Sequence, residues 1–406
     1  MSIRVFLDAR KLGDGGIGAY IENVVDGLLD FSAEESPVFE FTLLAPSVED
    51  SKKCPTISSA LGRWGRDVSV IYDSTPKYSL REYFAMPLRY RSELATHDLF
   101  HSPHYTLPFG IKIPRIVTVH DIIHMTHPDT ALHKPISSML IRSALSRATH
   151  VITVSEASRR KLLPYSNGRT QLTVIPNALR RSIAEIALRE LKPTVKTYGL
   201  KHDYILFVGG ERQHKGLHRL LKAWSIFKSA SSETAAEPLQ LRVVGANFSD
   251  DIRRHASALG IADSVVFCEA ISDEELKQLY RDARAVAVPS EEEGFGMVAL
   301  EAMSLGLPVI CTPVDSLREV CADCAWFSED FTPESFAAAL ASALSDERGR
   351  EAKVREGISR AAQFSLKVHA RRTAAVYASV CGHFVVDPYF SRLGKTERGT
   401  AASHGG

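Results

Sequence analysis

Residues 286–314 read VAVPSEEEGFGMVALEAMSLGLPVICTPV, and this stretch decides the fold. It begins within a short apolar run, residues 285–288, which is typical of a buried strand. A helix is expected from 297 to about 305, because Gly306 and a nearby proline are stop signals. Residues 307–312 have the composition of the next buried strand. A strand, a loop, a helix and a strand in succession are typical of a doubly wound α/β sheet.

The turn before this helix is built for an anion. Gly294 and Gly296 allow a tight backbone turn without a Cβ penalty. The backbone N–H groups of 294–298 lie at a helix N-terminus, where unpaired donors and a partial positive charge attract anions. Two carboxylates flank the turn, Glu293 before it and Glu301 inside the helix. A phosphate over the turn with hydroxyl acceptors on both sides suits a sugar nucleotide.

The spacing Glu293-x7-Glu301, with Gly-Phe-Gly after the first Glu and Ala302 after the second, resembles glycosyltransferase family 4. That family contains retaining enzymes of the GT-B fold. The resemblance implies that Glu293 contacts donor-sugar hydroxyls and that Glu301 binds the nucleotide ribose. It also makes the turn part of the donor site, through Gly294, Phe295, Gly296, Met297 and Val298. From the residues alone, a solvated acidic loop before an ordinary helix is the alternative.

Length and composition indicate a two-domain globular protein. A chain of 406 residues is too long for one ordinary core. A formal net charge of +1 lacks the basic excess of a nucleic-acid binder. No apolar run is long enough to span a bilayer, and the N-terminus goes straight into a strand without a signal-peptide pattern. The scattered cysteines are expected to be reduced thiols of a cytoplasmic protein, without metal: Cys54, Cys268, Cys311, Cys321, Cys324 and Cys381.

The chain begins with a strand–loop–helix pattern. A strand is expected over 3–7, a glycine-rich loop over 12–18, and a helix after it because apolar residues recur at helical spacing. In a doubly wound domain this is where backbone amides face a diphosphate. Any tight turn could use such a loop, so its glycines alone are a weak signal. The resemblance places Gly15 and Gly16 over the donor phosphates.

His120 ends the strand expected over 116–120. Catalytic groups in open α/β sheets lie at the carboxyl ends of strands, so this histidine is well placed. The resemblance implies that it contacts the donor sugar near the reacting carbon; the alternative is a structural histidine. Asp121 either orients the ring or caps the next turn. Four further histidines have no metal-site spacing, and any of them could contact the acceptor: His101, His104, His124 and His127.

The middle of the N-terminal half is basic. Residues 80–181 hold fourteen Lys and Arg against six Asp and Glu. The stretch 80–91 mixes basic and aromatic residues, as a membrane-surface patch does, since about 1 kcal/mol per basic residue is available near anionic lipid. Peripheral contact with the inner face of the plasma membrane is therefore one interpretation. A solvated face whose aromatic side chains lie in the core is the other.

A second strand–loop–helix pattern opens the C-terminal half, with a strand expected over 204–208 and a loop over 209–216. Arg212 and Lys215 lie in this loop. Two cations at a cleft can neutralise a diphosphate leaving group, and Arg can bind it bidentately. The resemblance assigns them that role; the alternative is a pair of exposed basic residues.

The expected fold is α/β, a GT-B pair of doubly wound Rossmann-like domains facing across a cleft. The predicted boundaries are an acceptor-side domain over 1–182, an interdomain connection over 183–202, a nucleotide-sugar domain over 203–365, a helix crossing back to the first domain over 366–386, and a loose tail over 387–406.

The predicted function is retaining transfer of a hexose without a metal or other cofactor. The run from Phe100 to Pro108, with the residues around His120, looks like bacterial mannosyltransferases of surface-polysaccharide assembly. This favours GDP-mannose as donor and a saccharide or lipid-linked saccharide as acceptor, with a UDP-sugar as the second choice. An epimerase or phosphorylase of the same fold and a non-catalytic nucleotide-sugar-binding subunit are the other hypotheses. Nucleic acid is not an expected partner.

Overall fold

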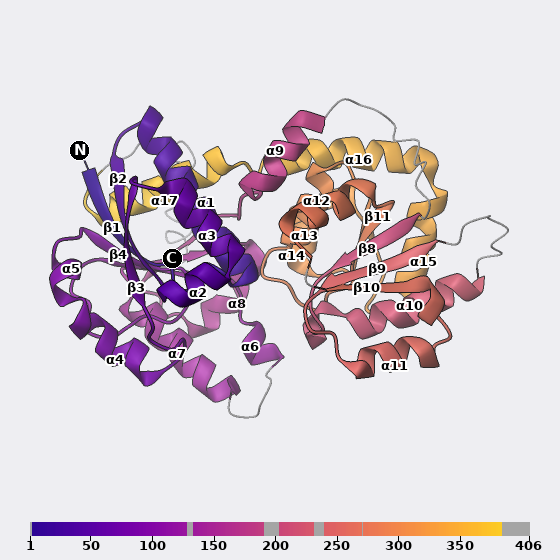
Figure 1. Ribbon diagram of the computed structural model, residues 1–406, viewed down its shortest axis with the longest axis horizontal. Coiled ribbons are helices and arrows are strands. Elements are labelled where there is room, and N and C mark those ends of the chain that lie inside the picture. The colour runs from indigo at the N-terminus through magenta and orange to yellow at the C-terminus, as the bar shows by residue number, and fades with distance from the viewer. Residues whose placement is uncertain (1, 128–132, 191–202, 231–238, 270, 384–406) are drawn as a thin grey trace, which may run out of the picture.

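The computed structural model describes residues 2–127, 133–190, 203–230, 239–269 and 271–383. Within these ranges the strands form two separate parallel sheets, each covered by helices (Figure 1). None of the described helices is both long and apolar enough to cross a lipid bilayer.

The N-terminal sheet has seven strands among the described residues, in the order β3-β2-β1-β4-β5-β6-β7. Its strands are β1 (Ser2–Asp8), β2 (Val38–Pro46), β3 (Val68–Asp73), β4 (Leu99–Ser102), β5 (Arg115–Val119), β6 (His150–Thr153) and β7 (Gln171–Val174). The helices between them are α1 (Gly15–Glu34), α2 (Val48–Lys53), α3 (Pro55–Trp64), α4 (Leu80–Arg89), α5 (Arg91–Ala95), α6 (Ile123–Thr126), α7 (His133–Arg147) and α8 (Glu156–Leu162), with the 3₁₀ turn η1 (Leu163–Tyr165).

Strand β1 shows why helices cover both faces of this sheet. Successive side chains of a strand point to opposite faces. Ile3, Val5 and Leu7 pack into one core with α1 and α3. Phe6 packs into the other core, with α4 and α7. Both faces are therefore apolar, as the near-continuous hydrophobic run of a buried parallel strand requires.

The C-terminal sheet has six strands among the described residues, in the order β10-β9-β8-β11-β12-β13. They are β8 (Tyr204–Val208), β9 (Gln240–Gly245), β10 (Val265–Glu269), β11 (Ala285–Val288), β12 (Val309–Cys311) and β13 (Trp326–Phe327). The helices are α9 (Arg181–Glu190), α10 (Leu217–Ala230), α11 (Asp250–Ala258), α12 (Asp273–Asp282), α13 (Met297–Ser304), α14 (Asp315–Cys321), α15 (Pro333–Ser345) and α16 (Glu347–Ala362), with 3₁₀ turns η2 (Gln213–Lys215), η3 (Ala262–Ser264) and η4 (Ala322–Cys324).

In both sheets the strand order reverses next to the first strand of the sheet. β1 lies between β2 and β4, and β8 lies between β9 and β11. Ligands of open α/β sheets bind outside the carboxyl ends of the strands at such a reversal. The loops after β1, β8 and β11 lie at these reversals, and the loop after β5 lies one strand further along, beyond β4. These four loops carry the predicted site residues.

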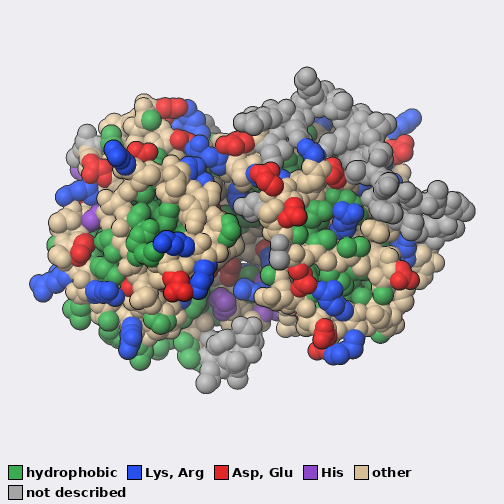
Figure 2. All heavy atoms as spheres, viewed as in Figure 1, with side chains coloured by type: hydrophobic (Ala, Val, Ile, Leu, Met, Phe, Trp, Pro, Cys, Tyr) green, Lys and Arg blue, Asp and Glu red, His purple; other side chains and the backbone are tan. Residues whose placement is uncertain are grey.

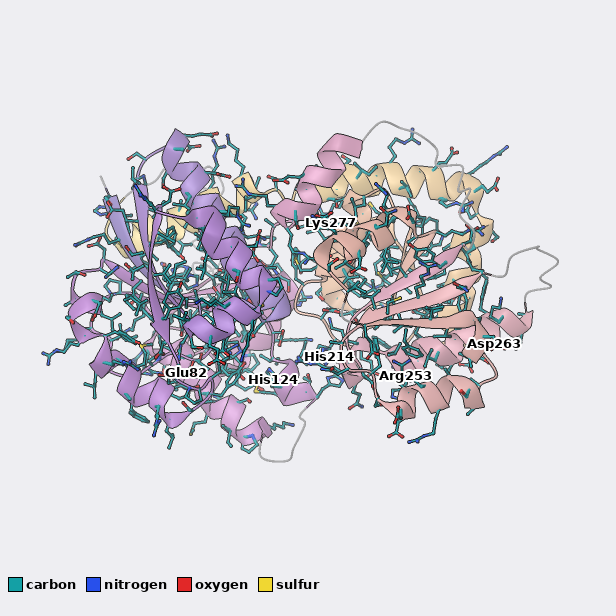
Figure 3. All side chains as sticks on the ribbon, in the orientation of Figure 1. Glu82, His124, His214, Arg253, Asp263 and Lys277 are labelled. Carbon is teal, nitrogen blue, oxygen red and sulfur yellow. The ribbon has the colours of Figure 1, made fainter. Side chains whose placement is uncertain are left out.

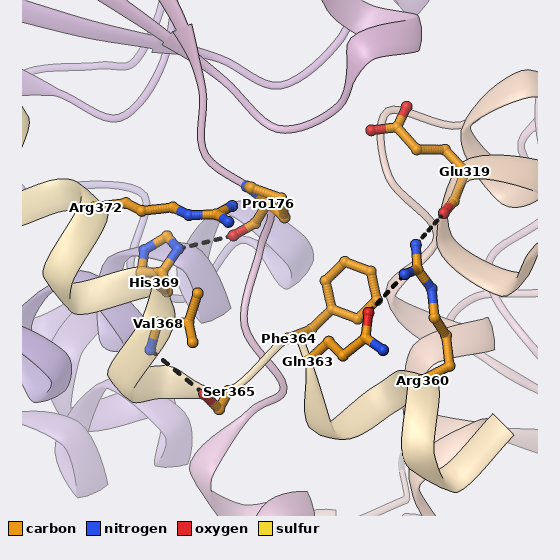
Figure 4. A pocket seen from close by; sticks show the side chains of 9 residues that line it. All are labelled: Pro176, Glu319, Arg360, Gln363, Phe364, Ser365, Val368, His369 and Arg372. Atoms are coloured by element: carbon orange, nitrogen blue, oxygen red, sulfur yellow. Dashed lines mark hydrogen bonds between the residues drawn. The ribbon is translucent and has the colours of Figure 1, made fainter. Parts of the chain in front are cut away.

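The chain passes between the two sheets twice. The first passage follows β7 and leads into α9, which begins at Arg181, two residues before the predicted start of the interdomain connection at 183. The second lies between α16 and α17 (Leu366–Val380), and α17 packs on α1 through Ala370, Ala374 and Tyr377 in the N-terminal core. A pocket of about 190 Å³ lies where these passages meet, lined by Pro176 and His369 among others (Figure 4).

Two of the expected elements have different boundaries in the structure, and one expected segment is not described by it. Helix α1 begins at Gly15, so Gly15 and Gly16 form its first turn and do not precede it as a loop. Strand β12 begins at Val309 and not at 307, because Pro308 has no N–H to donate to the ladder. The predicted tail, 387–406, lies outside the described residues.

A buried chain of hydrogen bonds ties α17 to the N-terminal sheet. The Tyr377 hydroxyl and His101 Nδ1 are 2.5 Å apart. His101 Nε2 and Thr118 Oγ1 are 2.9 Å apart, and Thr118 Oγ1 and the Tyr20 hydroxyl 2.8 Å. All four residues are at most 2% exposed. Each polar atom in this core thus depends on the next for its partner.

We predict that Tyr377→Phe lowers the free energy of unfolding by about 1–3 kcal/mol, because it leaves His101 Nδ1 buried without its partner. The measurement is the thermal midpoint of the purified chain. Tyr72→Phe is the matched control, since Tyr72 is 44% exposed. Equal midpoints for the two variants would show that this hydrogen bond does not stabilise the packing of α17.

Candidate active site

The predicted site residues come from strand ends of both sheets. Arg212 and Lys215 follow β8, Glu293 follows β11 and His120 follows β5. Figure 3 labels His124 and His214, which lie on the facing edges of the two halves. The rings of His127 and His214, one from each half, have centroids 6.1 Å apart. The two sets of loops therefore meet along one seam.

Glu293 is fixed by three contacts within the C-terminal half. Its carboxylate accepts hydrogen bonds from Lys215 Nζ at 2.8 Å and from Ser290 Oγ at 2.7 Å, both to Oε1. Its backbone carbonyl accepts from Ser316 Oγ at 2.8 Å. Both hydrogen bonds converge on Oε1, so Oε2 is the carboxylate oxygen that can accept a further hydrogen bond.

Gly294 is a point of close contact between the two halves. Its carbonyl accepts hydrogen bonds from Ser155 Oγ at 2.7 Å and Ser158 Oγ at 3.1 Å. A Cβ at position 294 would lie 2.6 Å from the His120 carbonyl oxygen and 3.2 Å from Asp121 Cβ. Only glycine allows this approach, which brings the turn over 294–298 against the end of β5.

Gly296 sets the direction of α13. Its φ is 110°, a conformation that L side chains rarely adopt, and a Cβ there would lie 2.6 Å from Leu317 Cδ2. No side chain caps this helix. The amides of Met297 and Val298 lie in its first turn, where helix geometry provides no intrahelical acceptor. The turn over 294–298 can therefore donate to a phosphate.

His120 is a neutral, oriented imidazole. Burial lowers its pKa to about 4, against the opposing effect of a hydrogen bond with the Pro103 carbonyl. That hydrogen bond joins Nε2 to the carbonyl oxygen at 3.0 Å, so Nε2 carries the proton. Nδ1 is then the acceptor. Asp121 does not orient this ring: its Oδ1 accepts from the Ile123 N–H at 3.0 Å and so caps the next turn.

Arg212 and the first glycines are more exposed than the Glu293 group. Arg212 is exposed just before η2, and its charge acts on the Tyr78 hydroxyl of the N-terminal half. Gly15 and Gly16 are exposed, with open space around any added Cβ. At Gly18, by contrast, a Cβ would lie 2.1 Å from the Leu12 carbonyl oxygen. The close approach in this loop thus occurs at Gly18, which the sequence pattern did not single out.

Glu301 is buried and already paired. It is 2% exposed, and its Oε1 accepts from Arg180 Nε at 2.7 Å. Its Oε2 accepts from the Tyr280 hydroxyl at 2.9 Å. Arg180 comes from the first passage between the sheets, so the sequence motif gave no sign of it. A ribose at Glu301 would share this carboxylate with Arg180 and Tyr280.

Glu292 joins the two halves, which the sequence pattern also missed. It is 4% exposed, and its carboxylate accepts from Lys161 Nζ at 2.5 Å and from the Thr126 hydroxyl. His127 Nδ1 lies 3.2 Å from Oε2. Burial acts to raise the pKa of Glu292, but the Lys161 and Thr126 hydrogen bonds and the Lys161 charge outweigh it, so the pKa is lowered. Glu292 thus anchors the turn over 294–298 to the N-terminal half.

Comparison with known proteins identifies the family of this chain. Residues 15–181 match the family model described as Glycosyltransferase Family 4, and residues 190–363 match that of Glycosyl transferases group 1. The chain belongs to glycosyltransferase family 4. Its two facing parallel sheets are the GT-B fold of these enzymes.

Individual relatives of this family-4 chain are distant. It is 28% identical to the O-antigen chain mannosyltransferase B of Escherichia coli over 69% of this chain and 74% of the relative. It is 26% identical to the D-inositol 3-phosphate glycosyltransferase of Corynebacterium glutamicum over 73% and 76%. The structure of WaaG, a glycosyltransferase involved in lipopolysaccharide biosynthesis, superposes with a TM-score of 0.66 at 16% identity, covering 92% of this chain and 99% of WaaG.

We predict that this glycosyltransferase loses stability as the pH falls from 7 to 5. Burial lowers the pKa of His101 to about 3 and that of His369 to about 4. In the unfolded chain the same groups titrate near pH 6.5, so below that pH the unfolded state binds more protons. Each such histidine removes about 1.4 kcal/mol of stability per pH unit below about 6.5.

The measurement is the thermal midpoint at pH 7, 6 and 5 for the natural chain and for His369→Asn. The variant lacks one buried titrating group, so its midpoint should fall less steeply between pH 6 and 5. A midpoint that stays constant down to pH 5 in the natural chain would contradict the assignment of neutral, buried histidines.

Proposed function

We propose that the protein transfers a hexose, with mannose from GDP-mannose as the best choice, to a saccharide or lipid-linked saccharide acceptor in surface-polysaccharide assembly. The observation that carries this proposal is the Lys215–Glu293 pair beside the uncapped N-terminus of α13, at the place where Gly294 meets His120. The relative from Escherichia coli, an O-antigen chain mannosyltransferase, supports the choice of sugar and acceptor class.

The diphosphate leaving group is stabilised in this proposal by cations and amides from one side of the cleft. Lys215 uses one of its N–H groups on Glu293, and an ammonium has three. Arg212 provides a planar, permanently charged fork from the same loop. The first-turn amides of α13 add donors that need no reorganisation when charge develops on the phosphate.

The sugar is positioned from both halves. Glu293, oriented by Lys215 and Ser290, accepts from a sugar hydroxyl, and His120 Nδ1 accepts from another. We propose that transfer retains the anomeric configuration and needs no metal. The bond from the anomeric carbon to the phosphate oxygen breaks, the acceptor oxygen bonds to that carbon on the same face, and the acceptor proton passes to the departing phosphate.

The place of action that we propose is the cytoplasm, with peripheral contact between the N-terminal half and an anionic membrane. A lipid-linked acceptor would be reached from such a surface. The inositol-phosphate transferase among the relatives shows that family members of similar coverage are named for a different acceptor class. A UDP-sugar is the alternative donor within the same site.

The test of the donor is a thermal-shift titration with GDP, UDP and ADP, each with and without EDTA. We expect GDP alone to raise the midpoint, and EDTA to have no effect. A nucleotide present at 100 times its Kd stabilises the folded state by about 2.7 kcal/mol. Stabilisation by UDP would overturn the mannose donor while leaving the site intact. Loss of stabilisation in EDTA would overturn the proposed metal independence.

We also predict that Glu293→Gln and Lys215→Met each reduce transfer by at least about 100-fold, because each removes a group that contacts the donor in the transition state. Initial rates of transfer from the stabilising nucleotide sugar are the measurement, with thermal midpoints to verify folding. Lys222→Met and Glu351→Gln are matched controls on exposed helix positions. Near-natural rates in either folded site variant would contradict the site.

A further inference from the structure

The most exposed apolar side chains of the described structure gather on one face of the N-terminal half. Leu80, Leu88 and Met139 are 77%, 75% and 63% exposed, more than any other large apolar side chain in the described ranges. Phe84, Ile136 and Phe109, from the same two helices, α4 and α7, and the loop after β4, are 55%, 48% and 37% exposed. We name these six residues the apolar face. Large apolar patches on a protein surface mark sites of interaction with proteins, ligands or membranes.

Helix α4 carries apolar side chains on its exposed side as well as on its buried side. Leu80, Phe84 and Leu88 recur every four residues, so they lie on one side of the helix. They point outward, while Tyr83 and Met86 on the other side are buried. Both sides of α4 are therefore apolar, and core packing uses only one of them.

Phe109 connects α4 to α7. Its ring stacks on Phe84 at 5.0 Å between centroids with an interplanar angle of 5°. The Arg147 guanidinium of α7 lies 3.9 Å from the Phe109 centroid on an aromatic face. Along α7, Ile136 and Met139 precede Arg147 at spacings that keep them on its outer side. Phe109 and Arg147 thus link the exposed apolar side of α4 to α7, which carries the exposed Ile136 and Met139.

Exposed basic side chains occur on the same two helices and in the loop between β4 and β5, where Arg89 is also paired with Asp73 at 3.4 Å. They are Arg81, Arg89, Lys112, Lys134 and Arg142. Glu82, the acidic residue within α4, is 1% exposed and paired with the buried Arg10, so it contributes little charge to the surface. Figure 2 shows hydrophobic side chains with Lys and Arg among them at the lower left, where Figure 1 places α4 and α7.

We propose that this face docks on an anionic lipid surface. Apolar and aromatic side chains enter the boundary between headgroups and acyl chains, and the cations around them contact anionic headgroups. The combination selects a membrane over an acidic protein, because the outermost groups are long, flexible aliphatic chains without polar partners and the charge lies around them.

One end of the apolar face borders the cleft. Tyr78, two residues before Leu80, packs against His104 with ring centroids 5.4 Å apart. Pro103, the residue before His104, accepts a hydrogen bond from His120 Nε2 at 3.0 Å. A lipid-linked acceptor held by its lipid at this face would therefore have its saccharide near the strand ends that carry His120. This deepens the proposed function by naming the surface that meets the membrane.

The test is co-sedimentation of the purified chain, without donor or acceptor, with two kinds of vesicle. One is phosphatidylcholine mixed with phosphatidylglycerol, and the other is phosphatidylcholine alone. We expect binding to the mixed vesicles and at least about tenfold less binding for the triple variant Leu80→Ser, Phe84→Ser, Leu88→Ser, since each side chain removes apolar contact with the acyl region. The charge variant Arg81→Glu, Lys112→Glu, Lys134→Glu should also bind at least about tenfold less.

The control is Val38→Ser, Val48→Ser, Ile226→Ser, which removes exposed apolar side chains away from this face and should bind as the natural chain does. Failure of the natural chain to bind the mixed vesicles would overturn the proposal, as would equal binding by the first triple variant. Size-exclusion chromatography without lipid tests for self-association. If the natural chain is a dimer and only the Leu80→Ser, Phe84→Ser, Leu88→Ser variant is a monomer, the face is a dimer interface and the membrane proposal is overturned. Nucleotide thermal shifts of the same variants should be unchanged, which separates this test from that of the donor.

Discussion

The contact between Gly294 and the end of β5 determines how the two halves of this glycosyltransferase meet. Ser155 and Ser158 donate to the Gly294 carbonyl, and Ser158 also donates to the His120 carbonyl at 2.9 Å. These serines lie at the start of α8, so the helix, the histidine strand and the donor turn form one unit. Any side chain at position 294 would push the turn away from His120 and open the seam.

The carboxylates that we propose to bind the donor already have partners within the protein. Glu293 is paired with Lys215, and Glu301 is held by Arg180 and Tyr280. A bound donor would therefore replace or share the hydrogen bonds that these carboxylates already make within the protein. This arrangement keeps the carboxylates oriented, so little ordering remains to be done when the sugar nucleotide binds. It also means that the affinity for a nucleotide is the difference between two sets of contacts.

The sequence predicted most of what depends on short-range pattern. The strand at Ala285–Val288 and the helix that follows Gly296 follow from local periodicity, and the family resemblance carried by one spaced motif implied the GT-B class. Arg180 on Glu301 and Lys161 on Glu292 could not be predicted, because each pair joins residues more than 120 positions apart and neither cation stands in a motif. Gly18 escaped notice for a related reason: its constraint comes from the Leu12 carbonyl and not from a turn type.

Hydrogen bonds between residues far apart in the sequence hold the two halves together. Glu319, from the C-terminal half, accepts from the backbone N–H groups of Glu156 and Ala157 and so caps α8 of the N-terminal half. Arg360 binds the carbonyls of Glu319 and Val320 beside the second passage of the chain. Separating the halves would leave the α8 amides and the buried Glu292 carboxylate to find water. Arg180 lies on the first passage of the chain between the halves. Separating the halves would therefore also disturb the hydrogen bond between Arg180 and Glu301.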